Sequence, residues 1–259
     1  MTLSKGTIKE LLKSQSFVLY GQPKWTFGKN TCNTYEVFAE TVLTLDQGSV
    51  HASEILPMIE SDEVLTQLFS TWFWEAALAM ARELWDRTGS RLHLSMNVLP
   101  FQANLPEFYE RIARGIDQSG LPYDHFQLEL SEAQQLTQRG IENLNLVHDE
   151  LGVKLLLGNF GTGYSNVNLL KFVHFDGIEL DKSFSRGIPE SEIAQKVVVG
   201  ISQLADVLDL QVCAKGIETA EQLNFYEGLG FSKGQGYLFG QPMPMDELAD
   251  YIKRYAKVD

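Results

Sequence analysis

Eight short runs of strand-forming residues limit the fold of this chain more than any other feature of its sequence. The runs are residues 16–23, 34–43, 91–98, 125–131, 153–159, 175–181, 210–215 and 231–236. From the third run onward, segments with helical patterns separate them, and strands that alternate with helices indicate a parallel sheet. Eight such strands in 259 residues predict closure into a barrel. We therefore expect an α/β fold, a TIM-like (β/α)8 barrel over residues 16–259, preceded by an N-terminal helix within residues 1–15.

Helix signals fill the segments between these runs. Between residues 190 and 208 apolar residues recur every three or four positions, on one helix face: Ile193, Val197, Ile201, Leu204 and Leu208. Phe108, Ile112 and Ile116 form a second such face, and Thr219 with Gln222 has the pattern of a capping box at a helix start. No segment of helix length separates the first two strand runs, so we expect the first strand to lie antiparallel.

Composition and charge exclude several classes of function. Acidic residues outnumber basic residues by 34 to 21, which gives a net charge of −13, and such a surface repels nucleic-acid polymers and anionic membranes. No apolar run approaches the ~20 residues of a membrane-spanning helix, and the amphipathic start of the chain is unlike a signal peptide. Cys32 and Cys213 lack metal-site spacing and are interpreted as free thiols. We therefore expect a cytoplasmic protein.

The predicted barrel also indicates where the functional residues lie, because TIM-like barrels carry their sites at the C-terminal ends of the strands. The residues expected at those ends are polar or otherwise special: Asn97, Glu129, Glu132, Gly158, Asn159, Glu179, Asp181, Lys215, Glu218 and Gln235. Any single one could be polar only because strand ends meet water. The whole set, placed in otherwise apolar strands, favours a functional rim.

Four short stretches identify a family. They are residues 159–165 (NFGTGYS), 180–184 (LDKSF), 216–219 (GIET) and 235–239 (QGYLF), in this order. With them the chain resembles the EAL family of bacterial cyclic di-GMP phosphodiesterases, from about residue 16 to residue 255. The resemblance implies a barrel whose first strand is antiparallel, in agreement with the missing helix. Active members cleave one phosphodiester bond of the dinucleotide with two Mg²⁺ or Mn²⁺ ions, which need oxygen ligands.

The resemblance implies that part of the family's metal site is kept. Glu36, in Glu36-Val-Phe where Glu-Ala-Leu is usual, together with Asn97 and Glu129, matches ligands of the first metal. Glu132 matches a residue that steadies the loop after the fifth strand. A single Mg²⁺ or Mn²⁺ ion on the first three residues would bind weakly, so we expect no cofactor.

Four positions depart from the family's catalytic pattern. The aspartate pair that binds both metals is replaced by Gly158 and Asn159, the catalytic lysine by Glu179, and a glutamate ligand of the second metal by Lys215. The phosphate-contacting arginine falls at or near Glu40. Loss of the carboxylates removes attraction for a dication, and Lys215 adds repulsion. We expect no intact catalytic residue, and so a degenerate phosphodiesterase that is not an enzyme.

Glu179 and Lys215 exchange the signs of the family's charges at these two positions. Such an exchange preserves an ion pair where a metal would otherwise lie, and a pair costs less than either buried charge alone. The alternative is acid–base chemistry by the pair. We expect the structural ion pair.

The resemblance also implies a set of ligand-binding residues. Positions that line the dinucleotide pocket in relatives are matched by Gln22, Phe38, Asp181, Glu218, Gln235 and Pro242. These groups suit guanine recognition, whereas Glu40 and Glu179 would repel the phosphates, so we expect cyclic di-GMP to bind weakly.

Two further segments bear on partners. In relatives the loop around Gly161 and Gly163 couples the site to a dimer interface, and the aromatic segment 69–85 is either a contact surface or ordinary barrel packing. The sequence therefore predicts a catalytically inactive EAL-type barrel that acts in cyclic di-GMP-related signalling by binding a protein partner, with a homodimer left open. The alternatives are a non-hydrolytic cyclic di-GMP receptor and an active phosphodiesterase with rearranged ligands.

Overall fold

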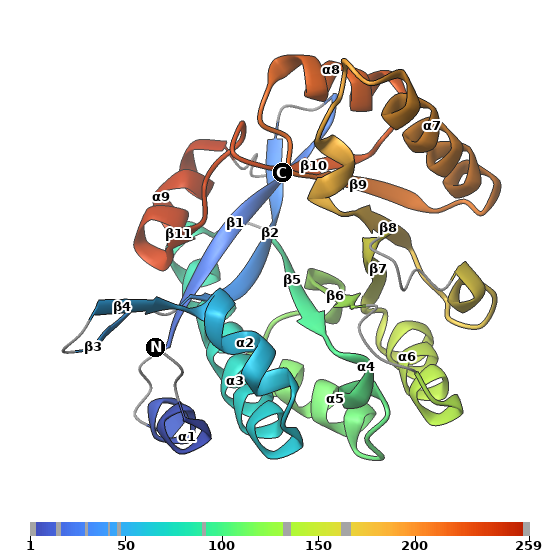
Figure 1. The fold of residues 1–259 in the computed structure, drawn as a ribbon. Coiled ribbons are helices and arrows are strands. Elements are labelled where there is room, and N and C mark those ends of the chain that lie inside the picture. The colour runs from blue at the N-terminus through green and yellow to red at the C-terminus, as the bar shows by residue number, and fades with distance from the viewer. Residues whose placement is uncertain are drawn as a thin grey trace.

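A closed barrel of parallel strands with one antiparallel member forms the centre of the protein (Figure 1). The structure is a computed structural model that describes residues 4–13, 17–28, 31–40, 42–45, 48–89, 92–131, 136–161 and 167–255. Within these residues, the strands that close the barrel are β1 (Val18–Thr26), β2 (Thr31–Glu40), β5 (His93–Val98), β6 (Phe126–Leu130), β7 (Lys154–Phe160), β8 (Gly177–Leu180), β9 (Gln211–Lys215) and β10 (Lys233–Gln235). Strand β1 is antiparallel to both β2 and β10. The predicted fold and the orientation of its first strand are confirmed.

Helices lie around the outside of the strands (Figure 1). The longer ones are α3 (Glu63–Thr88), α5 (Phe108–Ser119), α6 (Gln138–Leu151), α7 (Glu192–Val207), α8 (Ala220–Gly228) and α9 (Met245–Tyr255). The other described elements are α1 (Lys5–Lys13), β3 (Val42–Leu45), β4 (Gly48–His51), α2 (Ala52–Glu60), α4 (Pro100–Ala103), η1 (Tyr123–His125), η2 (Val167–Lys171), η3 (Lys182–Ser185) and β11 (Met243–Pro244). None of the helices in the described ranges is long and apolar enough to cross a membrane. The division into residues 1–15 and 16–259 stays a prediction.

Strand β6 illustrates how the sequence builds the two sides of the barrel wall. All five of its residues are buried, and successive side chains point to opposite faces of a strand. Phe126, Leu128 and Leu130 belong to the hydrophobic core that the outer helices share. Gln127 and Glu129 therefore point the other way, into the barrel. The alternation of side chains along the strand thus places the charge of Glu129 at the centre of the barrel.

The structure tests the helices that the sequence predicted. Helix α8 begins at the expected capping box, where the Thr219 side chain accepts from the Gln222 N–H and the Gln222 side chain accepts from the Thr219 N–H. The predicted apolar face of α5 is buried, from Phe108 to Ile116. The aromatic segment 69–85 is largely core packing, because Phe73 is buried and its aromatic neighbours pack against the same core.

Helix α7 has the predicted bounds within two residues, but much of its apolar face is exposed. Ile193 is 77% exposed, Val197 46% and Leu208 42%. The fully buried residues of α7 are Val198, Ser202 and Ala205. Each follows a residue of the predicted face by one position, and so lies about 100° around the helix from it. The exposed stripe is therefore available to contacts outside this chain.

Candidate functional site

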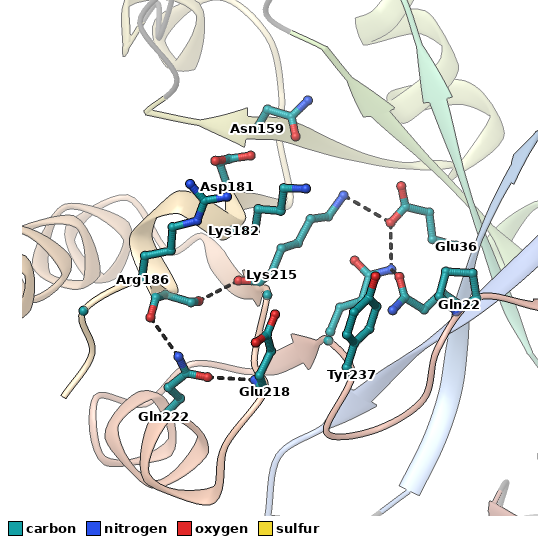
Figure 2. A pocket seen from close by; sticks show the side chains of 16 residues that line it. Gln22, Glu36, Asn159, Asp181, Lys182, Arg186, Lys215, Glu218, Gln222 and Tyr237 are labelled. Atoms are coloured by element: carbon teal, nitrogen blue, oxygen red, sulfur yellow. Dashed lines mark hydrogen bonds and ion pairs between the residues drawn. The ribbon is translucent and has the colours of Figure 1, made fainter. Parts of the chain in front are cut away.

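A cavity of about 690 Å³ opens at the C-terminal ends of the strands (Figure 2). Residues that line it include Gln22, Glu36, Asn159, Asp181, Lys182, Arg186, Lys215, Glu218, Gln235, Tyr237 and Pro242. Five of the six residues predicted to bind a ligand are in this set. The sixth, Phe38, lies in β2, but its side chain is outside the described part of the structure, as is all of Glu132. The cavity also contains two cationic side chains that the sequence analysis missed, Lys182 and Arg186.

At the floor of this cavity, five charged side chains gather inside the barrel, and two of them also line the cavity. This ionic cluster comprises Lys24, Glu36, Glu129, Glu179 and Lys215. The Lys215 Nζ lies 2.8 Å from Glu179 Oε2, 3.0 Å from Glu129 Oε2 and 3.1 Å from Glu36 Oε2. The predicted pairing of Glu179 with Lys215 is present. The ammonium group also contacts two carboxylates that the resemblance assigns to the first metal.

Lys24 is the member of the cluster that the sequence analysis did not find. It is 1% exposed, donates a hydrogen bond to Glu129 Oε1, and lies 2.5 Å from Glu179 Oε1 and 3.7 Å from Glu36 Oε2. A signal for it existed. Because side chains alternate along a strand, Lys24 shares the inner face of β1 with Gln22, which was already expected at the site.

Neutral side chains complete the hydrogen bonding of the carboxylates. Asn97 Nδ2 donates to Glu36 Oε1 over 3.0 Å, and Gln235 Nε2 donates to Glu36 Oε2 over 2.9 Å. Ser95 Oγ donates to Glu129 Oε1, while Ser95 itself accepts from Gln127 Nε2 over 2.7 Å. Asn97 thus supports Glu36 directly, and the cluster is held by fixed amide and hydroxyl donors as well as by charge.

The cluster keeps its charges through mutual attraction. Burial alone would raise the pKa of Glu179, but the charges of Lys215 and Lys24 outweigh burial and hold the pKa at about 2. Burial would lower the pKa of Lys24 and of Lys215, and the neighbouring glutamates reverse this, so both pKa values stand above the ordinary lysine value. Both lysines are therefore cations at neutral pH.

The carboxylates have the right chemistry to bind a divalent ion, but the two lysines around them do not fit a site for two such ions. Oxygens of Glu36, Glu129 and Glu179 lie within 4.8 Å of one another, as metal ligands would. Two ammonium groups already contact these oxygens, which leaves the five side chains with a formal charge of −1. A dication would have to displace a lysine from between its partners and be repelled by the other.

Gly158 and Asn159 carry no charge and are not members of the ionic cluster. The pairing of β7 with β8 shifts register between Leu157 and Phe160, and Asn159 has a left-handed backbone with φ of 50°, a conformation that asparagine tolerates better than most residues. Its side chain lines the cavity (Figure 2). This strand end therefore contributes an amide to the cavity wall where the resemblance would place carboxylates.

Comparison with known proteins identifies the family. The family model described as "EAL domain" matches residues 5–242. This chain belongs to the EAL domain family. The EAL domain is 30% identical over 241 residues to "Cyclic di-GMP phosphodiesterase PA2567" of Pseudomonas aeruginosa, covering 93% of this chain and 40% of that protein. It is 25% identical to "Cyclic di-GMP phosphodiesterase PdeR" of Escherichia coli, covering 96% of this chain and 37% of PdeR. The chain thus spans two fifths or less of these relatives.

Solved structures support the fold of the EAL domain. The EAL enzyme Bd1971 in its cAMP- and cyclic-di-GMP-bound form superposes with a TM-score of 0.89 at 24% identity, covering 96% of this chain and 68% of Bd1971. The PaMucR phosphodiesterase in complex with c-di-GMP superposes with a TM-score of 0.84 at 24% identity, covering 94% of this chain and 98% of that one. At 24% identity, these superpositions show a shared barrel architecture and no more.

Lys24 should be essential for the stability of this EAL domain. Lys24→Met leaves three buried carboxylates with a single ammonium group, and removing one partner from a buried ion pair costs about 3–5 kcal/mol. We expect a loss of that size in the free energy of unfolding at neutral pH, measured by urea denaturation. Lys182→Met removes an exposed lysine at the cavity and should change stability by less than about 0.5 kcal/mol. Equal stabilities of the two variants would contradict the structural role of Lys24.

Glu179 should make the free energy of unfolding depend on pH in the acid range. Its pKa is about 2 in the folded protein against 4.5 ordinarily, so it contributes stability that is fully present above about pH 4.5 and lost as the pH falls towards 2. By linkage this contribution is on the order of 3 kcal/mol. We expect the difference in unfolding free energy between wild type and Glu179→Gln to shrink as the pH falls from about 5. A difference that stays constant over this range would count against a charged, paired Glu179.

Proposed function

We propose that this EAL domain is a non-hydrolytic module of cyclic di-GMP signalling that acts by binding. The observation that carries the proposal is the position of two ammonium groups, those of Lys24 and Lys215, among the carboxylates of Glu36, Glu129 and Glu179. Both cations belong to the chain itself. They offset two of the three negative charges without providing a Lewis acid or a metal-activated water, which two-metal phosphodiester cleavage requires.

An active phosphodiesterase with rearranged ligands is the less favourable alternative. It would have to move both lysines out of a buried network before any ion could bind. Breaking one buried ion pair costs several kcal/mol, and the cluster contains several such contacts around each lysine.

The free cysteines Cys32 and Cys213 are both buried, and we place the protein in the reducing cytoplasm, where such thiols persist.

A protein partner is the binding target that the surface favours. We give the name α7 face to the exposed apolar residues on and directly after α7 together with those at η2: Val167, Phe172, Ile193, Val197 and Leu208. A hollow between η2 and the end of α7 lies on this face and is lined by Val167, Leu170, Leu204 and Leu208. Exposed apolar residues that line one hollow, as Val167 and Leu208 do, mark interaction sites on soluble proteins. We propose that a protein, either a second copy of this chain or another partner, covers the α7 face.

Ile193→Asp tests the α7 face. Ile193 is 77% exposed, so the variant should unfold within about 0.5 kcal/mol of wild type while losing association. Light scattering would report a homodimer, and capture from a bacterial lysate with wild type beside the variant would report another partner.

The matched control is Val64→Asp, because Val64 is also exposed and also occupies the second position of its helix, α3. Association that is absent in wild type, or equally retained in Ile193→Asp and Val64→Asp, would contradict this use of the face.

A cyclic di-GMP receptor is the second candidate, and the cavity at the rim favours it. Gln22, Asp181, Glu218, Gln235 and Pro242 line that cavity. Lys182 and Arg186 could meet phosphates there. Lys215 is less available, because three carboxylates already surround its ammonium group. With Glu36, Asp181 and Glu218 also facing the cavity, the balance of charge favours weak binding of an anionic ligand.

A titration with cyclic di-GMP, with and without Mn²⁺, separates the three hypotheses. We expect calorimetry to give an affinity weaker than about 1 μM, on the order of −8 kcal/mol or less favourable, and chromatography to show no linear dinucleotide. Tighter binding without product would establish the receptor. Linear product formed by wild type would establish the enzyme and overturn the non-hydrolytic proposal.

The control for this experiment is Lys24→Met combined with Lys215→Gln. This double variant keeps three carboxylates and removes both internal cations, so we expect Mn²⁺ to bind it and raise its melting temperature. Wild type and Lys182→Met should show no such rise. A Mn²⁺-dependent rise in wild type would show that the lysines do not exclude the ion.

A further inference from the structure

A second group of ligating side chains lies at the opposite end of the barrel from the cavity. It consists of His148 and Asp149, in the last turn of α6, and His174, which follows η2. Helix α6 leads into the start of β7, and residue 174 lies shortly before β8. Both segments therefore belong to the N-terminal ends of the strands. We name these three residues the His–Asp cluster.

The three side chains already converge on a common point. His148 Nδ1 lies 2.8 Å from Asp149 Oδ1, and His174 Nδ1 lies 3.0 Å from the same oxygen. One nitrogen or oxygen atom from each of the three residues lies within 4.8 Å of the others. Tetrahedral ligands of Zn²⁺, at about 2.0–2.2 Å from the ion, lie roughly 3.3 Å apart. Small movements would bring these atoms to that spacing.

The segment that carries His174 is fastened to α6 without any ion. Asn145, also on α6, accepts a hydrogen bond from the His174 N–H over 3.0 Å and donates one to the Phe172 carbonyl over 2.9 Å. These two bonds fix the backbone on either side of residue 173 against the helix. The ligands from the two segments are therefore positioned before a metal arrives, which lowers the entropy cost of binding.

A further carboxylate orients one of the histidines. His148 Nε2, the ring nitrogen that faces away from Asp149, lies 3.5 Å from Asp176 Oδ2. That oxygen in turn accepts from the Leu155 N–H over 2.8 Å. A metal-binding histidine commonly directs its second nitrogen to a carboxylate in this way, which fixes the ring and raises its basicity.

We propose that His148, Asp149 and His174 bind a divalent transition-metal ion, Zn²⁺ in the first instance, with Asp176 as the outer carboxylate. Two imidazoles and one carboxylate suit Zn²⁺ and its neighbours in the first transition row, whereas Mg²⁺ and Ca²⁺ prefer sites made of oxygen alone. The fourth position faces solvent, because the three side chains are 30%, 48% and 58% exposed. The ion would join the end of α6 to the connection between β7 and β8. This proposal does not depend on the proposed function, because it uses none of the residues at the rim.

The test is a Zn²⁺ titration of the full chain after treatment with EDTA. We expect one Zn²⁺ per chain by calorimetry, a higher melting temperature with Zn²⁺, and a visible absorption band when Co²⁺ replaces Zn²⁺. Asp149→Asn and His174→Ala should each abolish the band and the rise in melting temperature. Asp176→Asn keeps an oxygen that accepts from the Leu155 N–H, and it should lower the affinity for Zn²⁺ by about 10- to 100-fold.

The matched control is Glu142→Gln, which removes one exposed carboxylate from the same helix outside the His–Asp cluster. It should bind Zn²⁺ as wild type does. The proposal is overturned if wild type binds no Zn²⁺, or if Asp149→Asn and His174→Ala bind it as tightly as Glu142→Gln. Either result would leave the experiments on the rim unaffected.

Discussion

Attraction between two lysines and three glutamates inside the barrel is the interaction on which the rest of this site depends. Each charge comes from a different strand: Lys24 from β1, Glu36 from β2, Glu129 from β6, Glu179 from β8 and Lys215 from β9. Charges buried this deeply are tolerated only when they are paired and hydrogen bonded. The ionic cluster therefore forms only when the barrel closes, and through Lys24 it links β1 with β6 and β8, which are not its neighbours in the sheet.

The same cluster determines what remains possible at the rim. In a two-metal site the positive charge comes from solvent and can polarise a phosphate. Here the positive charge is covalently part of the chain, and the glutamates hold it in place beneath the cavity. The cavity persists, with Lys182 and Arg186 as its other cations. Under the proposed function, the barrel offers a shaped polar surface for binding at this end, and the α7 face offers an apolar surface on its outside.

The two ends of the barrel are connected through β7. Near its start, the Leu155 N–H donates to Asp176 beside the His–Asp cluster, and near its end Asn159 lines the rim cavity. One strand thus takes part in both sites, although no residue belongs to both. Asn145 and Asp176 already hold the lower end together by hydrogen bonds. An ion at the His–Asp cluster would therefore reinforce an existing connection between helix and strand.

The sequence by itself determined the elements and the family. Strand and helix periods are local properties, so all eight barrel strands, the capping box of α8 and the buried face of α5 could be predicted from spacing alone. The resemblance to the family placed Gln22, Asp181, Glu218, Gln235 and Pro242 at one cavity, and the exchanged signs predicted the pairing of Glu179 with Lys215.

Only the tertiary structure decided which of these residues meet inside the barrel. Lys24 lies 105 residues from Glu129 and 155 from Glu179 along the chain, and a lysine in a strand usually indicates a solvent-facing position. The exposure of Ile193 and the meeting of His148 with His174 depended likewise on how whole helices sit against the sheet. Periodicity shows that a helix has an apolar face, but packing decides whether that face is covered.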